Sequence, residues 1–372
     1  MAKFKYPLAR PYFSKSLREK ICADIDGVLE SGQLMMGPFQ DKFERAFAEL
    51  AGTPHAVSVN TCTTALTICL QYFGAKDHEV LVPSGAFVTD VSAVLFAGGT
   101  PVLVDMNPET LSFDLEDLER KRTGKTKGVI WVHLTGVISD EYREIMAFAK
   151  KHDLFLLEDA AHAHGGEIDG HKAGSLGDAG CFSFFPTKVL TSGTGGIITT
   201  SDEKLKQFAT EQRLFGKNQE TGDIDKLGND WFLDEIRCCV AYHQTRNAGD
   251  IVSHRRRLAA AYDDALANQP GVRCLNIPSG SKPAYYQYPV FVDSGLDIGV
   301  IQSRLASEFS VQAKPIYLPT HQEAVFQEFD TGTLKNTEQA LQRSMCLPLH
   351  LDMTTDDVKS ISDALVTIIR SS

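Results

Sequence analysis

The sequence predicts an α/β protein built around a mostly parallel β-sheet. Between residues 55 and 200, short β-rich runs alternate with segments of helix length, which is the pattern of strands joined by crossover helices. The run 127–134 (KGVIWVHL) is apolar on both faces, as expected of a parallel strand buried under helices. The length of 372 residues exceeds what one core usually organises, so we expect a second, smaller domain.

Strands and helices are predicted to alternate through the first part of residues 55–200. The predicted strands are 55–60, 79–83, 101–105, 127–134 and 155–157, and the predicted helices are 63–73, 88–97 and 141–152. The order changes after Asp178, where two strands, 181–185 and 196–200, are separated by only a short turn that carries Gly, Thr and Ser.

Beyond Trp231 the character of the chain changes to that of a smaller α+β domain. The predicted elements are a long helical stretch at 234–266, strands at 286–292 and 311–316, and helices at 297–307 and 355–369. The basic run His254-Arg255-Arg256-Arg257 is interpreted as a solvated helix face. We therefore expect a large domain over residues 1–245 and a small domain over 246–372, with the first 20 or so residues as a candidate to pack on the small domain.

Composition excludes several classes of partner. The formal net charge of -11 argues against general binding to nucleic acid or to an anionic membrane, because both carry phosphate. No apolar run approaches the roughly 20 residues that a membrane span requires. The eight cysteines show no paired C-x-x-C spacing, which favours reduced thiols and a cytoplasmic location.

Three polar segments follow predicted strands, at the sheet edge where ligands gather in parallel sheets. The first, Asn60-Thr61-Cys62-Thr63-Thr64, leads directly into a helix, and free N–H groups at a helix N-terminus form a phosphate seat. The alternative, which this motif alone favours, is plain N-capping by Thr61 or Thr63.

The second segment, 158–165, places Asp159 and His162 after a buried strand. A carboxylate there is costly unless it meets a cation or hydrogen-bond donors, and a pyridinium nitrogen would satisfy it. Asp159 could instead cap the next segment, and His162 could be a structural histidine. No metal is expected, because His162 and His164 are only two residues apart and no H-x-x-x-H or Cys cluster supports zinc.

The third segment ends in Lys188, which lies between an aromatic strand and a loop of small residues. Partial desolvation lowers the pKa of a lysine and leaves a neutral, nucleophilic amine, as Schiff-base chemistry requires. Ser183 and Thr187 could offer hydroxyls to a phosphate. An ordinary structural lysine remains the alternative from these residues alone.

Together the segments resemble the DegT/DnrJ/StrS family of sugar aminotransferases, a branch of the fold-type I pyridoxal-phosphate enzymes. The resemblance covers nearly the whole chain in order, and its most specific block runs from Gly174-Ser175-Leu176-Gly177-Asp178 to Lys188. The other matching blocks are Ser31-Gly32, Met36-Gly37-Pro38, Phe43-Glu44, 55–66, Pro83–Phe87, Pro101–Asp105, His133–Gly136, 158–165, Thr337-Glu338 and Leu347-Pro348-Leu349.

The resemblance implies the fold-type I architecture, pyridoxal 5'-phosphate as cofactor and a role for each matching residue. Lys188 looks like the Schiff-base lysine that also moves the proton, and Asp159 looks like the partner of the pyridine nitrogen, which keeps the ring an electron acceptor. His162 matches a residue near the cofactor's 3-oxygen, and Phe87 matches the aromatic residue stacked on the ring.

Further matches concern the phosphate, the partner subunit and the substrate. The residues that match the phosphate seat are Cys62, Thr63 and Ser183. Asp230 stands where a neighbouring subunit usually offers Asn to the phosphate, so the resemblance implies a homodimer with shared active sites. His321 and Gln322 fit a substrate-side loop from the small domain, and they could equally be ordinary polar loop residues.

The chain departs from the family pattern at three places. Val137 replaces the usual Gln, Thr194 replaces the usual Glu, and Asp230-Trp231-Phe232-Leu233 replaces Asn-Tyr-Arg-Met. An Asp facing a phosphate would be repulsive unless it were protonated or turned away. We interpret these changes as altered substrate recognition with the cofactor chemistry intact.

The expected function is transfer of an amino group, with L-glutamate as the donor, to a keto-sugar of the nucleotide-linked 3- or 4-keto-6-deoxy type. An aminocyclitol-forming transaminase and a non-enzymatic regulatory relative are alternatives. A further alternative is sugar 3-dehydration, whose enzymes carry histidine in place of the Schiff-base lysine, whereas Lys188 is present here.

Overall fold

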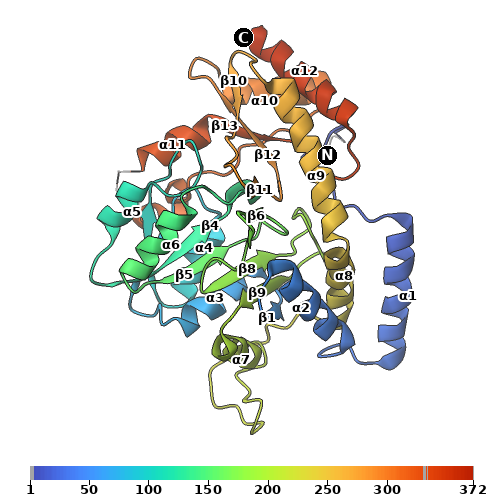
Figure 1. Ribbon diagram of the computed structural model, residues 1–372, viewed down its shortest axis with the longest axis vertical. Helices are drawn as coiled ribbons and strands as arrows, with labels where there is room; N and C mark the ends of the chain where they lie inside the picture. The colour runs from blue at the N-terminus through green and yellow to red at the C-terminus, as the bar shows by residue number, and fades with distance from the viewer. Residues whose placement is uncertain (1–3, 330–331, 333, 372) are drawn as a thin grey trace.

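A seven-stranded sheet forms the centre of the molecule, with the strand order β1-β9-β8-β5-β4-β2-β3 (Figure 1). The structure, a computed structural model, describes residues 4–329, 332 and 334–371. Pairing is parallel from β8 to β3, while β9 runs antiparallel to both β1 and β8. The predicted α/β class with a mostly parallel sheet is thus confirmed. The strands are β1 His55–Val59, β2 Glu79–Pro83, β3 Thr100–Val104, β4 Thr126–Val132, β5 Phe155–Asp159, β8 Ala179–Ser183 and β9 Gly196–Thr200.

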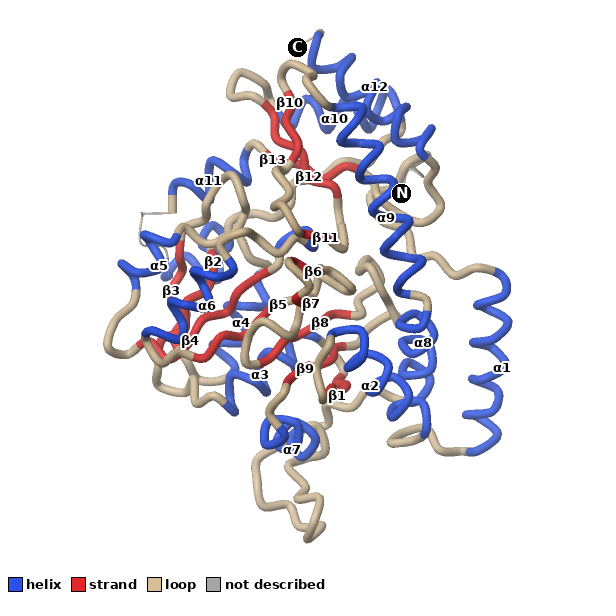
Figure 2. The backbone as a smooth tube through the Cα atoms, viewed as in Figure 1, coloured by secondary structure: helices blue, strands red, loops and turns tan. Residues whose placement is uncertain are grey.

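Helices cover both faces of this sheet (Figure 2). In β4, Val129 and Trp131 enter one hydrophobic cluster, whereas Ile130 and Val132 enter the other. The strand is therefore buried on both sides, as its sequence predicts. The helices that supply the first cluster are α2 Pro38–Ala51, α5 Leu115–Lys121, α6 Tyr142–Lys151 and α8 Glu235–Arg246. Those that supply the second are α3 Cys62–Tyr72, α4 Val88–Phe96 and α7 Glu203–Gln212.

The C-terminal part has its own antiparallel sheet and its own core. Strands β10 Val272–Cys274, β12 Tyr288–Val292 and β13 Ser344–Leu347 pair in that order. A third hydrophobic cluster joins them to helices α9 Ala248–Leu266, α10 Ile298–Phe309 and α12 Thr355–Arg370. The remaining elements are α1 Lys15–Ser31, α11 Lys335–Gln342, the short strands β6 Glu167–Ile168, β7 His171–Lys172 and β11 Ser281–Lys282, and the 3-10 turns η1 Leu134–Gly136, η2 Thr320–Gln322 and η3 Ala324–Phe329.

The predicted strand at 311–316 is wrong. Only two isolated bridges form there, from Val311 to Tyr6 and from Lys314 to Cys346. Pro315 has no N–H to donate to a ladder, and the segment changes partner between its two ends. The stretch therefore reads as β-rich in sequence without becoming a strand.

The long helical stretch predicted at 234–266 is two helices, α8 and α9, which meet at Asn247. The solvated-face interpretation of its basic run is wrong for Arg255, which is 3% exposed. Its guanidinium donates to the carbonyls of Tyr285, Tyr286 and Leu349 at 3.0–3.3 Å. The charge is buried because three carbonyl oxygens satisfy it.

The start of the described chain lies against the C-terminal part, beside α9 and α12 in Figure 1. Tyr6 accepts from Gln312 N and donates to Ser310 O, and Arg10 forms an ion pair with Asp352. The division of the chain after residue 245 stays a prediction. Within the described part of the chain, no helix combines the length and apolarity that crossing a membrane demands.

Candidate active site

A cavity of about 390 Å³ lies at the carboxyl ends of the parallel strands. Seven of the residues predicted for the site line it, namely Cys62, Thr63, Phe87, Asp159, His162, Ser183 and Lys188. Asp159 ends β5, Ser183 ends β8, and Cys62 opens the helix that follows β1. Because parallel strands end at the same sheet edge, residues far apart in sequence converge here.

The N-terminus of α3 forms a candidate anion-binding site. Cys62 and Thr63 are its first two residues, and the first N–H groups of a helix lack partners within the helix. Thr61 Oγ1 accepts from Thr64 N at 3.1 Å, so the capping interpretation is confirmed for Thr61. Capping and anion binding are compatible, because the cap satisfies Thr64 and leaves the two preceding N–H groups available.

The amine of Lys188 is electrostatically unusual. Burial lowers its pKa from the ordinary 10.5 to about 8, and the charge of Asp159 acts in the opposite direction. Lys188 Nζ lies 4.6 Å from the centre of the Tyr286 ring, a distance at which the ring face attracts the protonated amine. The lysine can therefore change its protonation state near neutral pH.

Asp159 is the acidic group of the same cavity. Burial raises its pKa, while the backbone N–H of Ala161 and the charge of Lys188 lower it. Ala161 N donates to Asp159 Oδ1 at 2.9 Å, and Cys62 Sγ lies 4.0 Å from the same oxygen. One N–H bond is modest compensation for a carboxyl that is 6% exposed.

The neighbouring residue on β5, Glu158, anchors the strand end from the opposite face. It accepts from His133 Nε2 at 2.7 Å and from three backbone N–H groups of the 174–177 turn at 2.7–2.8 Å. Successive strand residues point to opposite faces. Fixing Glu158 therefore fixes the direction of Asp159.

Aromatic rings form the remaining wall. The imidazole of His162 stacks on Tyr286 with centroids 4.1 Å apart and planes at 20°, and its Nε2 lies 3.0 Å from the hydroxyl of Tyr317. Burial lowers the pKa of His162 well below its usual value, so the ring is neutral. Phe87 lies 5.1 Å from Tyr317, ring centre to ring centre.

Tyr286 and Tyr317 are lining residues that sequence reasoning missed. Tyr286 begins a segment interpreted only as a strand, and Tyr317 ends the run Lys314–Tyr317 that precedes the predicted substrate loop. Both lie about a hundred residues or more from Lys188 in sequence, so only the packing of the C-terminal part against the sheet reveals them.

The model of the DegT/DnrJ/EryC1/StrS aminotransferase family matches residues 15–366. The chain belongs to this family. The resemblance seen in the motifs is therefore confirmed.

Individual relatives of this aminotransferase cover nearly its whole length. It is 29% identical to the spore coat polysaccharide biosynthesis protein SpsC of Bacillus subtilis, over 97% of both chains. It is 31% identical to a GDP-perosamine synthase of Caulobacter vibrioides, over 90% of this chain and 91% of the relative. The solved structure of DesI in the presence of its TDP-sugar product has 28% identity and a TM-score of 0.91, over 99% of this chain and 94% of that one. The predicted fold-type I architecture of the aminotransferase agrees with this likeness.

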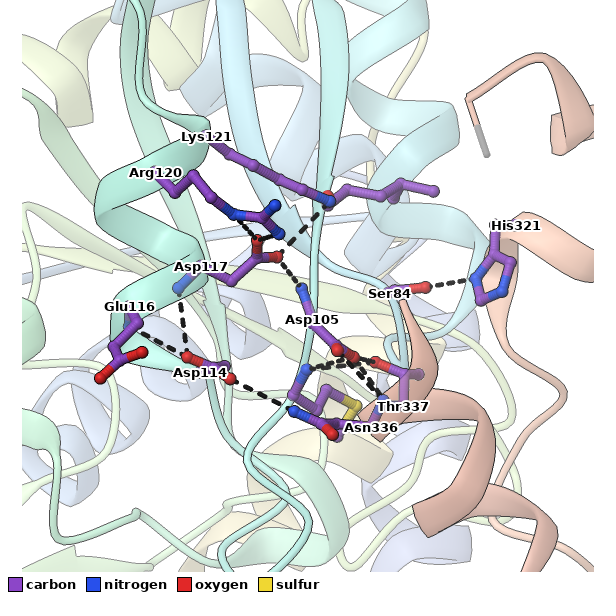
Figure 3. A network of polar contacts seen from close by, with 12 residues as sticks. Ser84, Asp105, Asp114, Glu116, Asp117, Arg120, Lys121, His321, Asn336 and Thr337 are labelled. Carbon is purple, nitrogen blue, oxygen red and sulfur yellow. Dashed lines mark hydrogen bonds and ion pairs between the residues drawn. The ribbon is translucent and has the colours of Figure 1, made fainter. Parts of the chain in front are cut away.

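Three predicted residues of the aminotransferase lie outside the cavity lining. Asp230 is exposed in the loop between α7 and α8. His321 is buried, with Nδ1 2.6 Å from Ser84 Oγ and Nε2 3.0 Å from Glu338 Oε1. Figure 3 shows its ring turned toward Ser84. Gln322 is exposed and donates to the same Glu338 carboxylate at 3.3 Å.

A polar network beside His321 docks the C-terminal part of the aminotransferase on the sheet (Figure 3). Asp105, which follows β3, accepts from the backbone N–H groups of Asn336 and Thr337 at 3.0 and 2.7 Å. Asp117 in turn accepts from Asp105 N at 2.7 Å. The motif around Thr337 therefore has a structural task that its sequence alone does not reveal.

Of the departures from the family pattern, only Thr194 lines the cavity, and its Oγ1 donates to Asn60 O at 3.3 Å. Val137 and Phe232 are buried in the protein interior, at 6% and 9% exposure. Among these departures, Thr194 is therefore the one whose side chain lies at the cavity of this aminotransferase.

His162 and His164, which were considered as metal ligands, lie in different surroundings. His164 packs on the rings of Phe47, Phe182 and Phe184, and burial lowers its pKa to about 3. His162 faces the cavity instead. The pair therefore does not converge on a common point.

Proposed function

We propose that this family member is an aminotransferase that uses pyridoxal phosphate to convert a nucleotide-linked keto-sugar into an amino-sugar, with L-glutamate as the donor. The observation that carries the proposal is one cavity holding both a lysine whose pKa is about 8 and the buried carboxyl of Asp159. Perturbed groups of complementary role in one cleft are typical of active sites.

The residues present fit the cofactor. The start of α3 and Ser183 would hold a phosphate, Asp159 would hold a ring nitrogen, and Phe87 and His162 would supply an aromatic ring and an imidazole beside the cofactor. His162 Nδ1 is buried without a hydrogen-bond partner among the described residues. Such an atom marks a place where a polar ligand atom would be satisfied. When bound, pyridoxal phosphate supplies an electron-withdrawing ring that stabilises negative charge on the substrate carbon.

Each residue has a task that follows from its environment. Lys188 Nζ, neutral in part at neutral pH, would attack a carbonyl carbon and later take up and return a proton. Asp159 would hold a proton on the ring nitrogen by remaining ionised beside it. Neutral His162, fixed by Tyr317 and Tyr286, would offer hydrogen bonds without adding charge. The aromatic wall excludes water, which strengthens these interactions.

The substrate class is inferred from what the relatives' names say. The relative in Caulobacter vibrioides is named for a GDP-linked sugar, and the DesI structure was determined with a TDP-sugar. The bases differ while the sugar diphosphate is common to both. We therefore propose a sugar attached to a nucleoside diphosphate, of the 3- or 4-keto-6-deoxy type, with Thr194 contributing to selection among such sugars.

The decisive test compares the purified wild type with Lys188→Ala after incubation with pyridoxal phosphate. We expect a visible absorption band of lysine-bound cofactor in the wild type alone, and L-glutamate should bleach it. Amino-sugar formation is then measured with keto-sugars linked to GDP, dTDP or UDP, and with the free sugars. Absence of the band, or a band that L-glutamate leaves unchanged, would reject the transaminase assignment. Turnover of the free sugars alone would reject the nucleotide requirement.

We also propose a homodimer with shared active sites. The loop from α7 to α8 extends away from the body of the molecule in Figure 1, and it exposes Phe215, Ile224 and Leu227, the last at 96%. Apolar side chains on a projecting loop favour a partner surface. Asp230 lies at the end of the same loop, so it would approach the partner's cavity. Light scattering should give twice the chain mass, and a monomer at micromolar concentration would contradict the dimer.

The cytoplasm is the location that we propose for the enzyme. All eight cysteines are free thiols, including the buried Cys69 and Cys181, whose sulfurs are 3.9 Å apart. Neighbouring thiols that stay reduced fit a reducing compartment. Fractionation of the native host, with the protein found outside the cytoplasmic fraction, would contradict this location.

A further inference from the structure

A second carboxyl group lies behind Asp159 and has no part in the mechanism described above. Asp90 belongs to the first turn of α4 and is 0% exposed. Its neighbours Phe87 and Thr89 line the cavity, whereas Asp90 itself does not. The carboxyl is thus enclosed by protein directly beside the proposed cofactor site.

The hydrogen-bonding situation of Asp90 is unusual for an aspartate. Among the described residues, no N–H or O–H donor reaches either of its carboxyl oxygens. Its hydrogen-bonding neighbour is the carboxyl of Asp159, and the charge of Lys188 also acts on it. Two carboxylates cannot form a hydrogen bond with each other, since both only accept. A hydrogen bond between the two carboxyls therefore requires a proton on one of them, as in other carboxyl pairs that share a buried site.

We propose that Asp90 is a positioning residue that acts through Asp159, in that Asp90 carries the proton shared by the two carboxyls and donates it as a hydrogen bond to Asp159. The pair then bears one negative charge rather than two. That charge resides on Asp159, which also accepts from Ala161 N at 2.9 Å and lines the cavity. The inference rests on the proposed function, because it gives Asp159 its ionised form at the cofactor's ring nitrogen.

The groups that surround the pair agree with this assignment. Burial, followed by the charge of Asp159, raises the pKa of Asp90 well above its usual value. Burial also raises the pKa of Asp159, but there the N–H of Ala161, the charge of Lys188 and the hydrogen bond with Asp90 act in the opposite direction. The other titratable groups that face Asp90 are Lys188, Cys62 and Tyr317. Burial raises the pKa of both the Cys62 thiol and the Tyr317 hydroxyl, so both stay neutral. The protonated amine of Lys188 then faces a carboxyl pair that carries one negative charge in total.

The first experiment uses the cofactor-free protein, so it is independent of the proposed reaction. Infrared difference spectra are recorded at pH 8 between the wild type and Asp90→Asn. We expect the C=O band of a protonated carboxyl in the wild type, its loss in Asp90→Asn and its survival in Asp159→Asn. The matched control is Asp169→Asn, because Asp169 is ionised by its bonds to Tyr142 and Arg143, and Asn tolerates its left-handed backbone at φ 50. This control should retain the full band.

Two outcomes of the infrared experiment would overturn the proposal. One is the absence of any protonated-carboxyl band that depends on Asp90. The other is a band that survives in Asp90→Asn and disappears in Asp159→Asn, since the proton would then belong to Asp159.

The second experiment measures binding of pyridoxal phosphate. An amide keeps an N–H donor for Asp159, so Asp90→Asn should bind within about twofold of the wild type, whereas Asp90→Ala should bind about tenfold or more weakly, as expected for loss of a hydrogen bond to a charged group. Equal affinities of both variants, whether weakened or unchanged, would show that no donated hydrogen bond is involved. If the wild type itself bound no cofactor, the proposed function would fail while the infrared result still decided the position of the proton.

Discussion

The most direct consequence of the cavity is the titration of Lys188 in the cofactor-free protein. A pKa of about 8 in place of 10.5 raises the neutral fraction at pH 7 from roughly 0.03% to about 10%, a factor of about 300. The neutral amine is the nucleophile, so the rate at which Lys188 captures an aldehyde should rise about tenfold per pH unit up to pH 8 and level off above it. Removing the charge of Asp159 in Asp159→Asn should lower the pKa further, by about one unit.

The assay is reductive methylation with ¹³C-formaldehyde followed by carbon NMR, in which each dimethylated lysine gives a resonance that moves as it titrates. Loss of one resonance in Lys188→Ala assigns it, and exposed Lys127 serves as the internal reference. A Lys188 resonance that titrates together with Lys127 would refute the desolvation argument. An upward shift in Asp159→Asn would refute the coupling.

Three further predictions test the supporting structure. Arg255→Met should lower the free energy of unfolding in urea by about 3 kcal/mol or more, because three buried carbonyls lose a charged donor. The exposed control Arg257→Met should change it by less than about 0.5 kcal/mol. Equal effects of the two substitutions would contradict the burial of Arg255. Glu158→Gln should cost about 1.5–3 kcal/mol in the same assay, because this buried carboxylate accepts from His133 Nε2 and from three backbone N–H groups, and an amide cannot replace both of its oxygens as acceptors. A loss no larger than that of an exposed Glu-to-Gln change would contradict this prediction. If the dimer brings the Asp230 carboxylate near the phosphate, Asp230→Asn should tighten binding of pyridoxal phosphate several-fold, because a repulsive negative charge is removed. Equilibrium dialysis measures this affinity, and an unchanged value would mean that Asp230 lies away from the phosphate.

Much of the central sheet could be predicted because each strand and each crossover helix is marked by the residue pattern of its own short segment. The run 127–134 is apolar at every position that must be buried, and each crossover helix follows its strand closely. Lys188 could also be singled out from its neighbours, since an aromatic strand and a small-residue loop leave little room for water. The motifs then identified the family, and membership of that family implied the fold-type I architecture.

What could not be predicted depends on contacts between distant segments. Arg255 stands in a run of basic residues that any surface helix could carry, and only the carbonyls of residues 285, 286 and 349 make its burial possible. Tyr317 had no sequence signal for its bond to His162, 155 residues away. Asp90 stands in the first turn of a helix, a position where acids are common, so its sequence position gives no signal. Its lack of donors becomes visible only in the folded protein, where α4 packs on α3, β2 and β3 and encloses the side chain.

The origin of two wall residues so late in the chain has a consequence for biosynthesis. While the ribosome is still adding residues beyond β9, the lysine, its carboxylate and the anion seat have already been synthesised, yet Tyr286 and Tyr317 have not. Until residue 317 has been added, the cavity around Lys188 lacks two of its lining rings. The burial that lowers the pKa of Lys188 therefore requires the C-terminal part of the chain as well as the sheet.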